Sequence, residues 1–433
     1  MSRPPLIDVH CHVMSGRDMP IAELTEKTLE IQEGKPKAIA RAAGKAAARM
    51  VRFDQEDDCG GKCEAPVSFA EELDPEADLD DAIERLKAQD PEFRRLLEEE
   101  LAGELACGPE CFGDPRGGSS VRCTLRWTRL LRKCRSSITR AMVDQSPALD
   151  LYVPMTVDMD YAFGAVPDVP YRQQIHGMRS LVGRWEGTDG GVWVHPFVSF
   201  DPRRKGAMKM VEEALSAGFI GVKLYPVMGY LPTDPALEPL FAFCEEHGVP
   251  ITTHTSWTGA VSDAAYKHYA DPDGWAALLK RHERLRIDLA HFGGYPEADL
   301  DQPGNWAGKI IPLLERYDLV YVDTAFHIGA VDERRRFLLQ LSGLPPVRRA
   351  RVLSRMMYAS DWHMTVPEGV DRDYYDEHLA DWREVFGDEG REAYLGGNAM
   401  DFLGLREGGA TRKRLMDWYK PAERPWWLEP GNR

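Results

Sequence analysis

His10 and His12 stand one residue apart at the end of the first apolar segment of this 433-residue chain. In a β-strand, residues i and i+2 point to the same side, so both imidazoles could reach one ion. A neutral imidazole is a good ligand for zinc. Alone, however, the pair is a weak signal, because two surface histidines would give the same pattern.

Three further candidate ligands end later apolar segments. His254 ends the segment ITTH, His291 ends DLAH and Asp361 ends YASD. Each of them alone could be an ordinary core or surface residue. Together with the histidines of the first segment they lie on four predicted strands, always at the carboxyl end, where barrel enzymes form their active sites. The joint pattern therefore predicts a metal site.

Such a site needs strands that all end in one place. Eight short segments rich in β-branched and apolar residues predict buried parallel strands, and helical patterns lie between many of them. An open doubly wound sheet would show the same α/β alternation, but the polar residues at the strand ends favour a (β/α)8 TIM-type barrel. The predicted strands are residues 5–13, 149–159, 191–200, 218–226, 249–256, 285–294, 319–326 and 356–362.

Six segments together resemble the amidohydrolase superfamily, and most of all its amidohydrolase-2 branch of metal-dependent hydrolases and decarboxylases. The resemblance covers residues 5–13 and 149–405 and leaves out the long stretch between them. The matching segments are IDVHCH, GFIGVKLYP, ITTH, LAHFGG, YASDW and GGNAMDFLGL.

The resemblance implies that four residues bind one catalytic divalent metal, with zinc the first choice and manganese or iron the alternatives. It also makes Asp361 the general base toward an attacking water, whose pKa a divalent metal lowers toward about 7. His291 is either a ligand of a second metal or a catalytic histidine that orients the substrate. The four implied ligands are His10, His12, His254 and Asp361.

Lys223, in the segment KLYP, is the main ambiguity of the site. The segment resembles that of one dihydroorotase group, in which a lysine of the fourth strand is carbamylated and bridges two metals. Alternatively, Lys223 remains an ammonium group that binds a substrate carboxylate, and the site holds one metal. Tyr225, Trp257 and His327 follow strand ends and are expected to contact the substrate, with packing under loops as the alternative.

The spacing of the strands predicts three parts. Residues 1–19 and 141–405 form the barrel, residues 20–140 form a mostly helical insertion after the first strand, and residues 406–433 form a C-terminal tail. Because the insertion leaves from the carboxyl end of a strand, we expect it to lie over the pocket as a lid or a substrate-recognition domain.

Six of the eight cysteines fall in the insertion. Two pairs share the spacing Cys-x-x-x-Cys, and four thiolates could hold a structural zinc ion. A redox-active or disulfide-linked lid and a set of unconnected thiols are the alternatives. The two pairs are Cys59 with Cys63 and Cys107 with Cys111.

Composition narrows the class of partner. The net charge of −16 comes without a basic patch, which argues against nucleic acid as a partner. No apolar stretch reaches the roughly 18–20 residues that span a membrane, and no signal-peptide pattern precedes His10, so we expect a cytoplasmic protein. The tryptophan-rich tail could cross the interface of a homodimer or dock on its own barrel.

The leading prediction is a hydrolase that cleaves a C–N (amide-type) or ester-like bond of a small-molecule or peptide substrate, with metal-activated water. A nonoxidative decarboxylase or hydratase of a carboxylated acid would use the same metal site. A noncatalytic scaffold, with the insertion as the binding element, is the third alternative.

Overall fold

The computed structural model describes residues 3–31, 34, 35, 37–52, 94, 127, 130–146, 148–185, 191–256, 259–294, 299–327, 331–366 and 373–429. Among these residues, no helix is long and apolar enough to cross a membrane.

The described strands are short and, except for β3, run parallel to their neighbours. They are β1 (Ile7–Cys11), β2 (Leu151–Pro154), β3 (Gly183–Trp185), β4 (Val192–Val194), β5 (Phe197–Ser199), β6 (Gly221–Leu224), β7 (Ile251–His254), β8 (Ile287–Ala290), β9 (Val320–Asp323) and β10 (Met356–Met357).

The strands form two sheets, in the orders β1-β2-β4-β3 and β10-β9-β8-β7-β6-β5. A bridge between Met155 and Phe197 joins the sheets at one side. At the other side the amide of Asp361 donates to the carbonyl of His10. The ladder is therefore not continuous around the barrel, but the predicted TIM-type α/β fold is confirmed.

The predicted third strand, residues 191–200, is in fact two strands. β4 pairs with β2, whereas β5 pairs with β6, and Pro196 lies between them. Because proline has no backbone N–H, it cannot donate to a ladder and is confined to strand ends and irregular positions. The chain therefore changes sheets at this residue.

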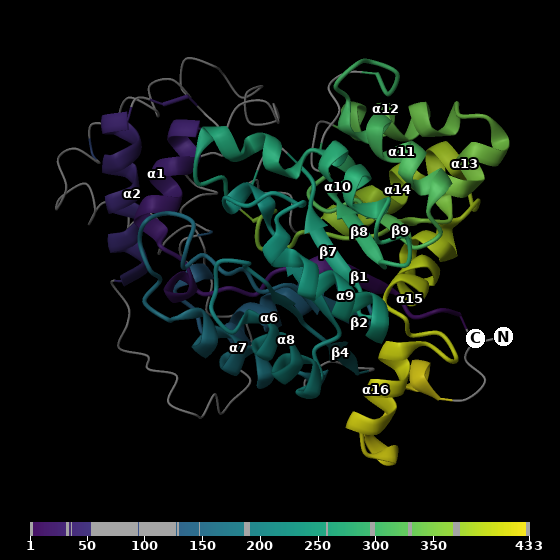
Figure 1. The fold of residues 1–433 in the computed structure, drawn as a ribbon, viewed down its shortest axis with the longest axis horizontal. Coiled ribbons are helices and arrows are strands. Elements are labelled where there is room, and N and C mark those ends of the chain that lie inside the picture. The colour runs from purple at the N-terminus through teal and green to yellow at the C-terminus, as the bar shows by residue number, and fades with distance from the viewer. Residues whose placement is uncertain are drawn as a thin grey trace.

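Helices are arranged around the strands (Figure 1). Many are amphipathic and turn an apolar side toward the sheets, as expected for surface helices. They are α1 (Ile21–Ile31), α2 (Lys37–Arg52), α6 (Arg135–Gln145), α7 (Tyr171–Arg179), α8 (Ala207–Ser216), α9 (Glu238–His247), α10 (Pro272–Leu279), α11 (Trp306–Arg316), α12 (Val331–Ser342), α13 (Pro346–Leu353), α14 (Tyr374–Phe386), α15 (Asn398–Phe402) and α16 (Ala410–Trp418).

The C-terminal tail docks on its own chain. Trp427 is fully buried in a cluster that includes Val9 of β1 and Leu151 of β2. The guanidinium of Arg412 donates to the carbonyls of Trp427 and Leu428, at 3.0 and 2.6 Å. These contacts fit the intramolecular alternative for the tail, and the homodimer stays a prediction.

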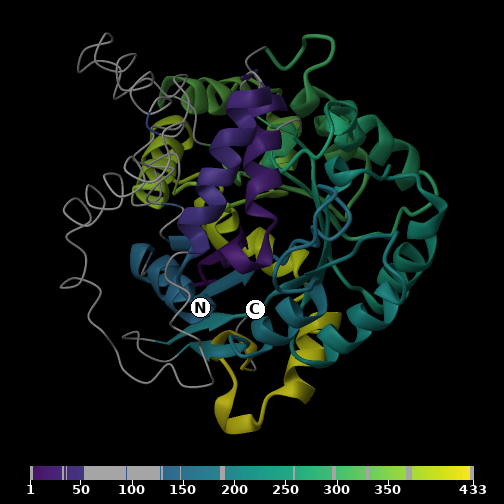
Figure 2. The same cartoon turned by 90° about the vertical axis from the view of Figure 1, so that its left-hand side faces the viewer.

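Helices α1 and α2 pack at the end of the barrel that carries the candidate ligands. Leu24 and Val51 share an apolar cluster with Met159 and Met228, which follow the carboxyl ends of β2 and β6. Figure 2 shows the two helices, in purple, in front of the strands. The predicted role of residues 20–140 as a lid remains a prediction, and the four cysteines of the predicted structural zinc site lie outside the described residues.

Candidate metal centre

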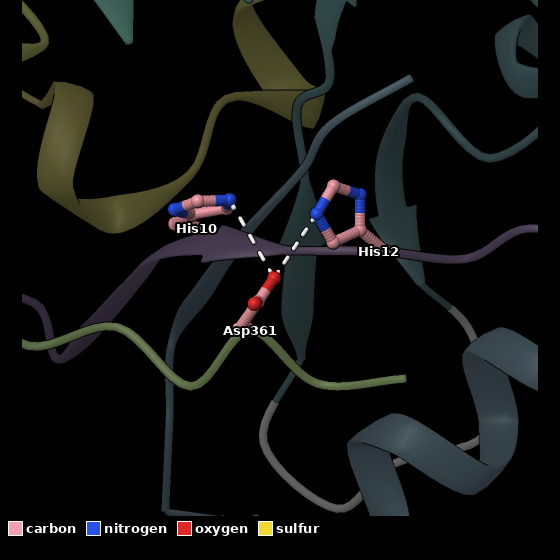
Figure 3. Close-up of side chains that lie close together, drawn as sticks. All are labelled: His10, His12 and Asp361. Atoms are coloured by element: carbon pink, nitrogen blue, oxygen red, sulfur yellow. Dashed lines mark ion pairs between the residues drawn. The ribbon is translucent and has the colours of Figure 1, made fainter. Parts of the chain in front are cut away.

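Three side chains converge at the carboxyl end of β1. The Nε2 atom of His12 lies 3.1 Å from Oδ1 of Asp361, and Nε2 of His10 lies 3.6 Å from the same oxygen. Ligand atoms of all three residues lie within 4.8 Å of one another, close enough to hold one ion. Figure 3 shows the Asp361 carboxylate pointing between the two imidazoles.

The backbone holds Asp361 in this position. Its amide donates to the carbonyl of His10 at 2.8 Å, and the amide of His12 donates to the carbonyl of Trp362 at 2.9 Å. Asp361 itself has a φ of 53°, in the left-handed region that non-glycine residues rarely adopt. Such a conformation costs roughly 1–3 kcal/mol, so the neighbouring bonds must stabilise it.

The second nitrogen of each imidazole is also engaged. The Nδ1 atom of His10 lies 2.8 Å from Oδ2 of Asp323, and Nδ1 of His12 lies 2.9 Å from the carbonyl oxygen of Met155. A neutral imidazole that donates from Nδ1 presents the lone pair of Nε2. Both Nε2 lone pairs are thus directed toward Asp361, as in metal sites whose histidines are held by an outer partner.

The residues present fit a divalent cation. Oδ1 of Asp361 is buried and has no hydrogen-bond partner among the residues that the structure describes. A buried oxygen without a partner is costly and indicates a missing ligand or water. Two imidazoles and one carboxylate are a donor set that suits zinc, with room for manganese or iron.

The charge states also suit metal binding. Burial, and then the nearby Lys223, lower the pKa of His10 to about 3, although Asp323 opposes the shift. Burial works against ionisation of Asp361, but the imidazoles of His12, His10 and His291 around it hold the pKa of that carboxyl below its usual range. At neutral pH, His10 is therefore an uncharged ligand and Asp361 an anionic one.

Lys223 of β6 lies inside the same cluster. Its side chain is fully buried, and Nζ lies 3.0 Å from Nε2 of His10. Burial lowers the pKa of Lys223 to about 8, and the charges of Asp323, Asp361 and Asp288 limit the shift. The structure thus places this lysine beside the candidate ligands, and both of its predicted roles stay predictions.

His254 and His291 form a second part of the site. Nε2 of His291 lies 2.9 Å from Nδ1 of His254, and the His291 ring centroid is 5.1 Å from that of His10. The ring of Tyr225 stacks on His254 with centroids 4.3 Å apart. At Gly259, whose φ is 95°, an added Cβ would lie 2.5 Å from the Tyr225 hydroxyl and 2.8 Å from the His254 ring. Only glycine therefore fits above this pair.

The other residues predicted to contact the substrate are His327, Tyr225 and Trp257. His327 is buried, and its Nε2 donates to the carbonyl of His291 at 2.7 Å. In the structure it therefore contacts the backbone of a site residue. Its contact with a substrate stays a prediction, as does that of Tyr225. Trp257 lies outside the described residues.

Sequence reasoning missed three buried acids within the strands. Asp8 of β1 accepts from the hydroxyl and the amide of Ser360, at 2.5 and 3.1 Å, and so fixes the segment before Asp361. Asp323 of β9 binds His10, and Asp288 of β8 accepts from the Thr252 hydroxyl at 3.1 Å. A charged residue inside an otherwise apolar strand segment was the available signal, because carboxylates are seldom fully buried without a partner.

The chain was compared with known proteins. A family model described as amidohydrolase matches residues 153–405, more than half of the chain. No curated protein matches it.

Several solved structures are similar to the chain at low sequence identity and with TM-scores below 0.5. An uncharacterized TIM-barrel protein from Bordetella bronchiseptica is 18% identical, with 62% of this chain and 82% of that chain covered and a TM-score of 0.42. A candidate 2-pyrone-4,6-dicarboxylic acid hydrolase from Pseudomonas putida is 16% identical, with 61% of this chain and 86% of that chain covered and a TM-score of 0.44. The 4-oxalomesaconate hydratase from Rhodopseudomonas palustris is 14% identical, with 95% of this chain and 98% of that chain covered and a TM-score of 0.36.

Proposed function

Because the chain belongs to the amidohydrolase family, we propose that it is a metal-dependent hydrolase that cleaves a C–N (amide-type) or ester-like bond of a small-molecule or peptide substrate. One observation carries the proposal. The Nε2 atoms of His10 and His12 converge on a buried oxygen of Asp361 that has no hydrogen-bond partner among the described residues.

We assign one divalent metal, zinc in first place, to four ligands. When bound, such a metal supplies Lewis acidity, which polarises a substrate carbonyl and makes water a stronger acid. Ligand atoms of three of these residues lie within 4.8 Å of one another. His254 lies outside that group and contacts His291, whose ring centroid is 5.1 Å from that of His10. The assigned ligands are His10, His12, His254 and Asp361.

The protein's own residues would handle the protons. Asp361 is ionised and buried, so it can accept a proton from the attacking water without competition from solvent. Burial, ahead of all other causes, lowers the pKa of His291, which leaves this imidazole neutral beside Asp361. Its Nδ1–H donates to the carbonyl of Ala325 at 2.9 Å, so Nε2 carries the lone pair, which could bind a second metal or accept a hydrogen bond or a proton from the substrate. Lys223 would bridge two metals as a carbamate or bind a substrate carboxylate as an ammonium group.

The reaction can be tested with zinc-reconstituted protein in ¹⁸O-labelled water. We expect a panel of amides, lactones and esters to contain a substrate whose carboxyl product carries one ¹⁸O atom. The matched control is the double variant His10→Ala, His12→Ala, which should be inactive. Release of CO₂ from a carboxylated acid, or addition of water without bond cleavage, would favour the decarboxylase or hydratase alternative instead.

A further inference from the structure

Asp323 contacts two separate parts of the candidate centre with one carboxylate. It is the last residue of β9, and its side chain is fully buried. Oδ2 accepts from Nδ1 of His10 at 2.8 Å. Oδ1 accepts from the backbone amides of His291 and Ala325, at 2.7 and 3.0 Å. Both oxygens therefore accept from N–H donors. Ligand atoms of His10, His291 and Asp323 also lie within 4.8 Å of one another, so an ion held directly by Asp323 is the alternative to a positioning role.

This carboxylate is held in its charged form by what surrounds it. A buried carboxylate persists only if donors satisfy its oxygens. The three N–H groups do so here.

The bond to His10 sets which nitrogen of that ring carries the proton. With the proton on Nδ1, facing Asp323, the lone pair of Nε2 faces Asp361 and Lys223. With the opposite tautomer, a hydrogen would occupy the position that a metal needs.

The bond to His291 stabilises an unusual backbone. His291 has a φ of 64° and Phe292 a φ of 46°, both in the left-handed region. The short amide bond to Asp323 helps to offset the cost of this turn. Because Nε2 of His291 contacts Nδ1 of His254, the position of this turn also decides where His254 lies.

We propose that Asp323 is a positioning residue that fixes the tautomer of His10 and the backbone turn of His291 at once, and so couples the two parts of the metal centre. The inference rests on the proposed function in that the centre is taken to bind a divalent metal. Asp323 does not bind the metal itself but acts through its two partners.

The substitution Asp323→Asn tests this role with little change in size. The amide can still accept from His291, but its NH₂ group would face His10 and favour the wrong tautomer. We expect zinc affinity, measured by competition with a chromophoric chelator, to fall by about 10- to 100-fold. Asp381→Asn is the matched control, because this buried acid of α14 accepts from the Arg334 guanidinium, away from the candidate ligands, and we expect it to keep the wild-type affinity.

A second readout is independent of the metal. In the ¹⁵N spectrum of the apoprotein with labelled histidine, wild type should show His10 protonated at Nδ1, assigned by its loss in His10→Gln. Asp323→Asn should lose this signature, and Asp381→Asn should keep it. A drop in zinc affinity with the His10 tautomer unchanged would indicate a merely structural role and overturn the proposal.

Wild-type zinc affinity in Asp323→Asn would also overturn it. If that variant does not fold, the wild-type spectrum decides, because a His10 proton on Nε2 contradicts the proposal by itself. If wild type binds no zinc in the barrel, the proposed function fails, whereas the apoprotein spectrum still tests the tautomer. The two failures can therefore be told apart.

Discussion

The Nζ atom of Lys223 lies 3.0 Å from Nε2 of His10, on the side of the imidazole that faces Asp361. Since both side chains are fully buried, the amine and a metal ion would compete for one nitrogen lone pair. This contact makes Lys223 the residue that best separates a centre with one metal from a centre with two.

We expect Lys223→Met to bind one equivalent of zinc more tightly than wild type. The substitution keeps an unbranched side chain but removes a buried positive charge next to a ligand, and like charges in a low dielectric repel strongly. Zinc stoichiometry and affinity, measured in bicarbonate buffer, check the prediction. Lys209→Met, at an exposed position of α8, is the control. If wild type binds two zinc ions and Lys223→Met loses one of them, the carbamate-bridged alternative is correct.

The paired substitution His10→Ala and His12→Ala should abolish zinc binding in the barrel while the fold persists. Removal of both imidazoles leaves Asp361 as the sole member of the convergent group. In wild type, zinc at about 100 times its Kd should stabilise the fold by about 2.7 kcal/mol. Thermal unfolding with and without zinc measures this difference, which should vanish in the variant. A zinc-dependent shift that survives both in this variant and after further replacement of Cys59, Cys63, Cys107 and Cys111 by serine would show that the barrel ligands are assigned incorrectly.

Trp127 links the insertion to the segment that carries Asp361. Its indole Nε1–H donates to Nδ1 of His363 at 2.9 Å, and His363 is fully buried with a φ of 92°. We expect Trp127→Phe to lower the free energy of unfolding by about 0.5–1.5 kcal/mol through loss of this bond. Trp185→Phe is the matched control, because Nε1 of Trp185 has no partner among the described residues. Equal losses in denaturant unfolding would refute a specific role for the bond.

His195 should make the fold sensitive to mild acid. It is fully buried between the Gly218 carbonyl and the Tyr419 hydroxyl, each 2.8 Å away. Burial lowers the pKa of His195 to about 4, although the bond to Gly218 opposes the shift. In the unfolded chain the group titrates near about 6.5.

Between these two values the unfolded chain binds a proton that the folded chain excludes, so stability falls as the pH decreases from about 6.5 to about 4. The full loss is about 3 kcal/mol for this one group. His195→Gln keeps a hydrogen-bonding side chain that does not titrate, and we expect a flatter dependence of unfolding free energy on pH. Parallel curves for wild type and variant would mean that His195 does not contribute.

Much of the candidate site could be predicted from the sequence because strand geometry is local. His10 and His12 share one side of β1 because residues of a strand alternate, and His254 and Asp361 could be located by the strand ends that they follow. Cys11, between the two histidines on the same strand, lies in the main apolar core, in keeping with that alternation.

Other features depend on contacts between distant segments. Asp323 and His10 are 313 positions apart in the sequence, and no local sequence pattern predicts that they form a hydrogen bond. The left-handed φ of Asp361 goes together with its backbone bond to His10 of β1, a contact between distant segments that no local pattern predicts. The break at Pro196 was visible in the sequence, but a proline can also occupy the edge of a single strand, so its effect depends on the neighbouring strands.

Anomalous diffraction at the zinc absorption edge, from crystals soaked in zinc, tests the central claim most directly, because it locates each ion. We expect one peak within ligand distance of Nε2 of His10, Nε2 of His12 and the carboxylate of Asp361, with His254 turned toward it. A second peak about 3.5–4 Å away, bridged by Lys223, would extend the centre to two metals. The absence of any peak in the barrel would contradict the assignment of a metal centre and with it the proposed hydrolase.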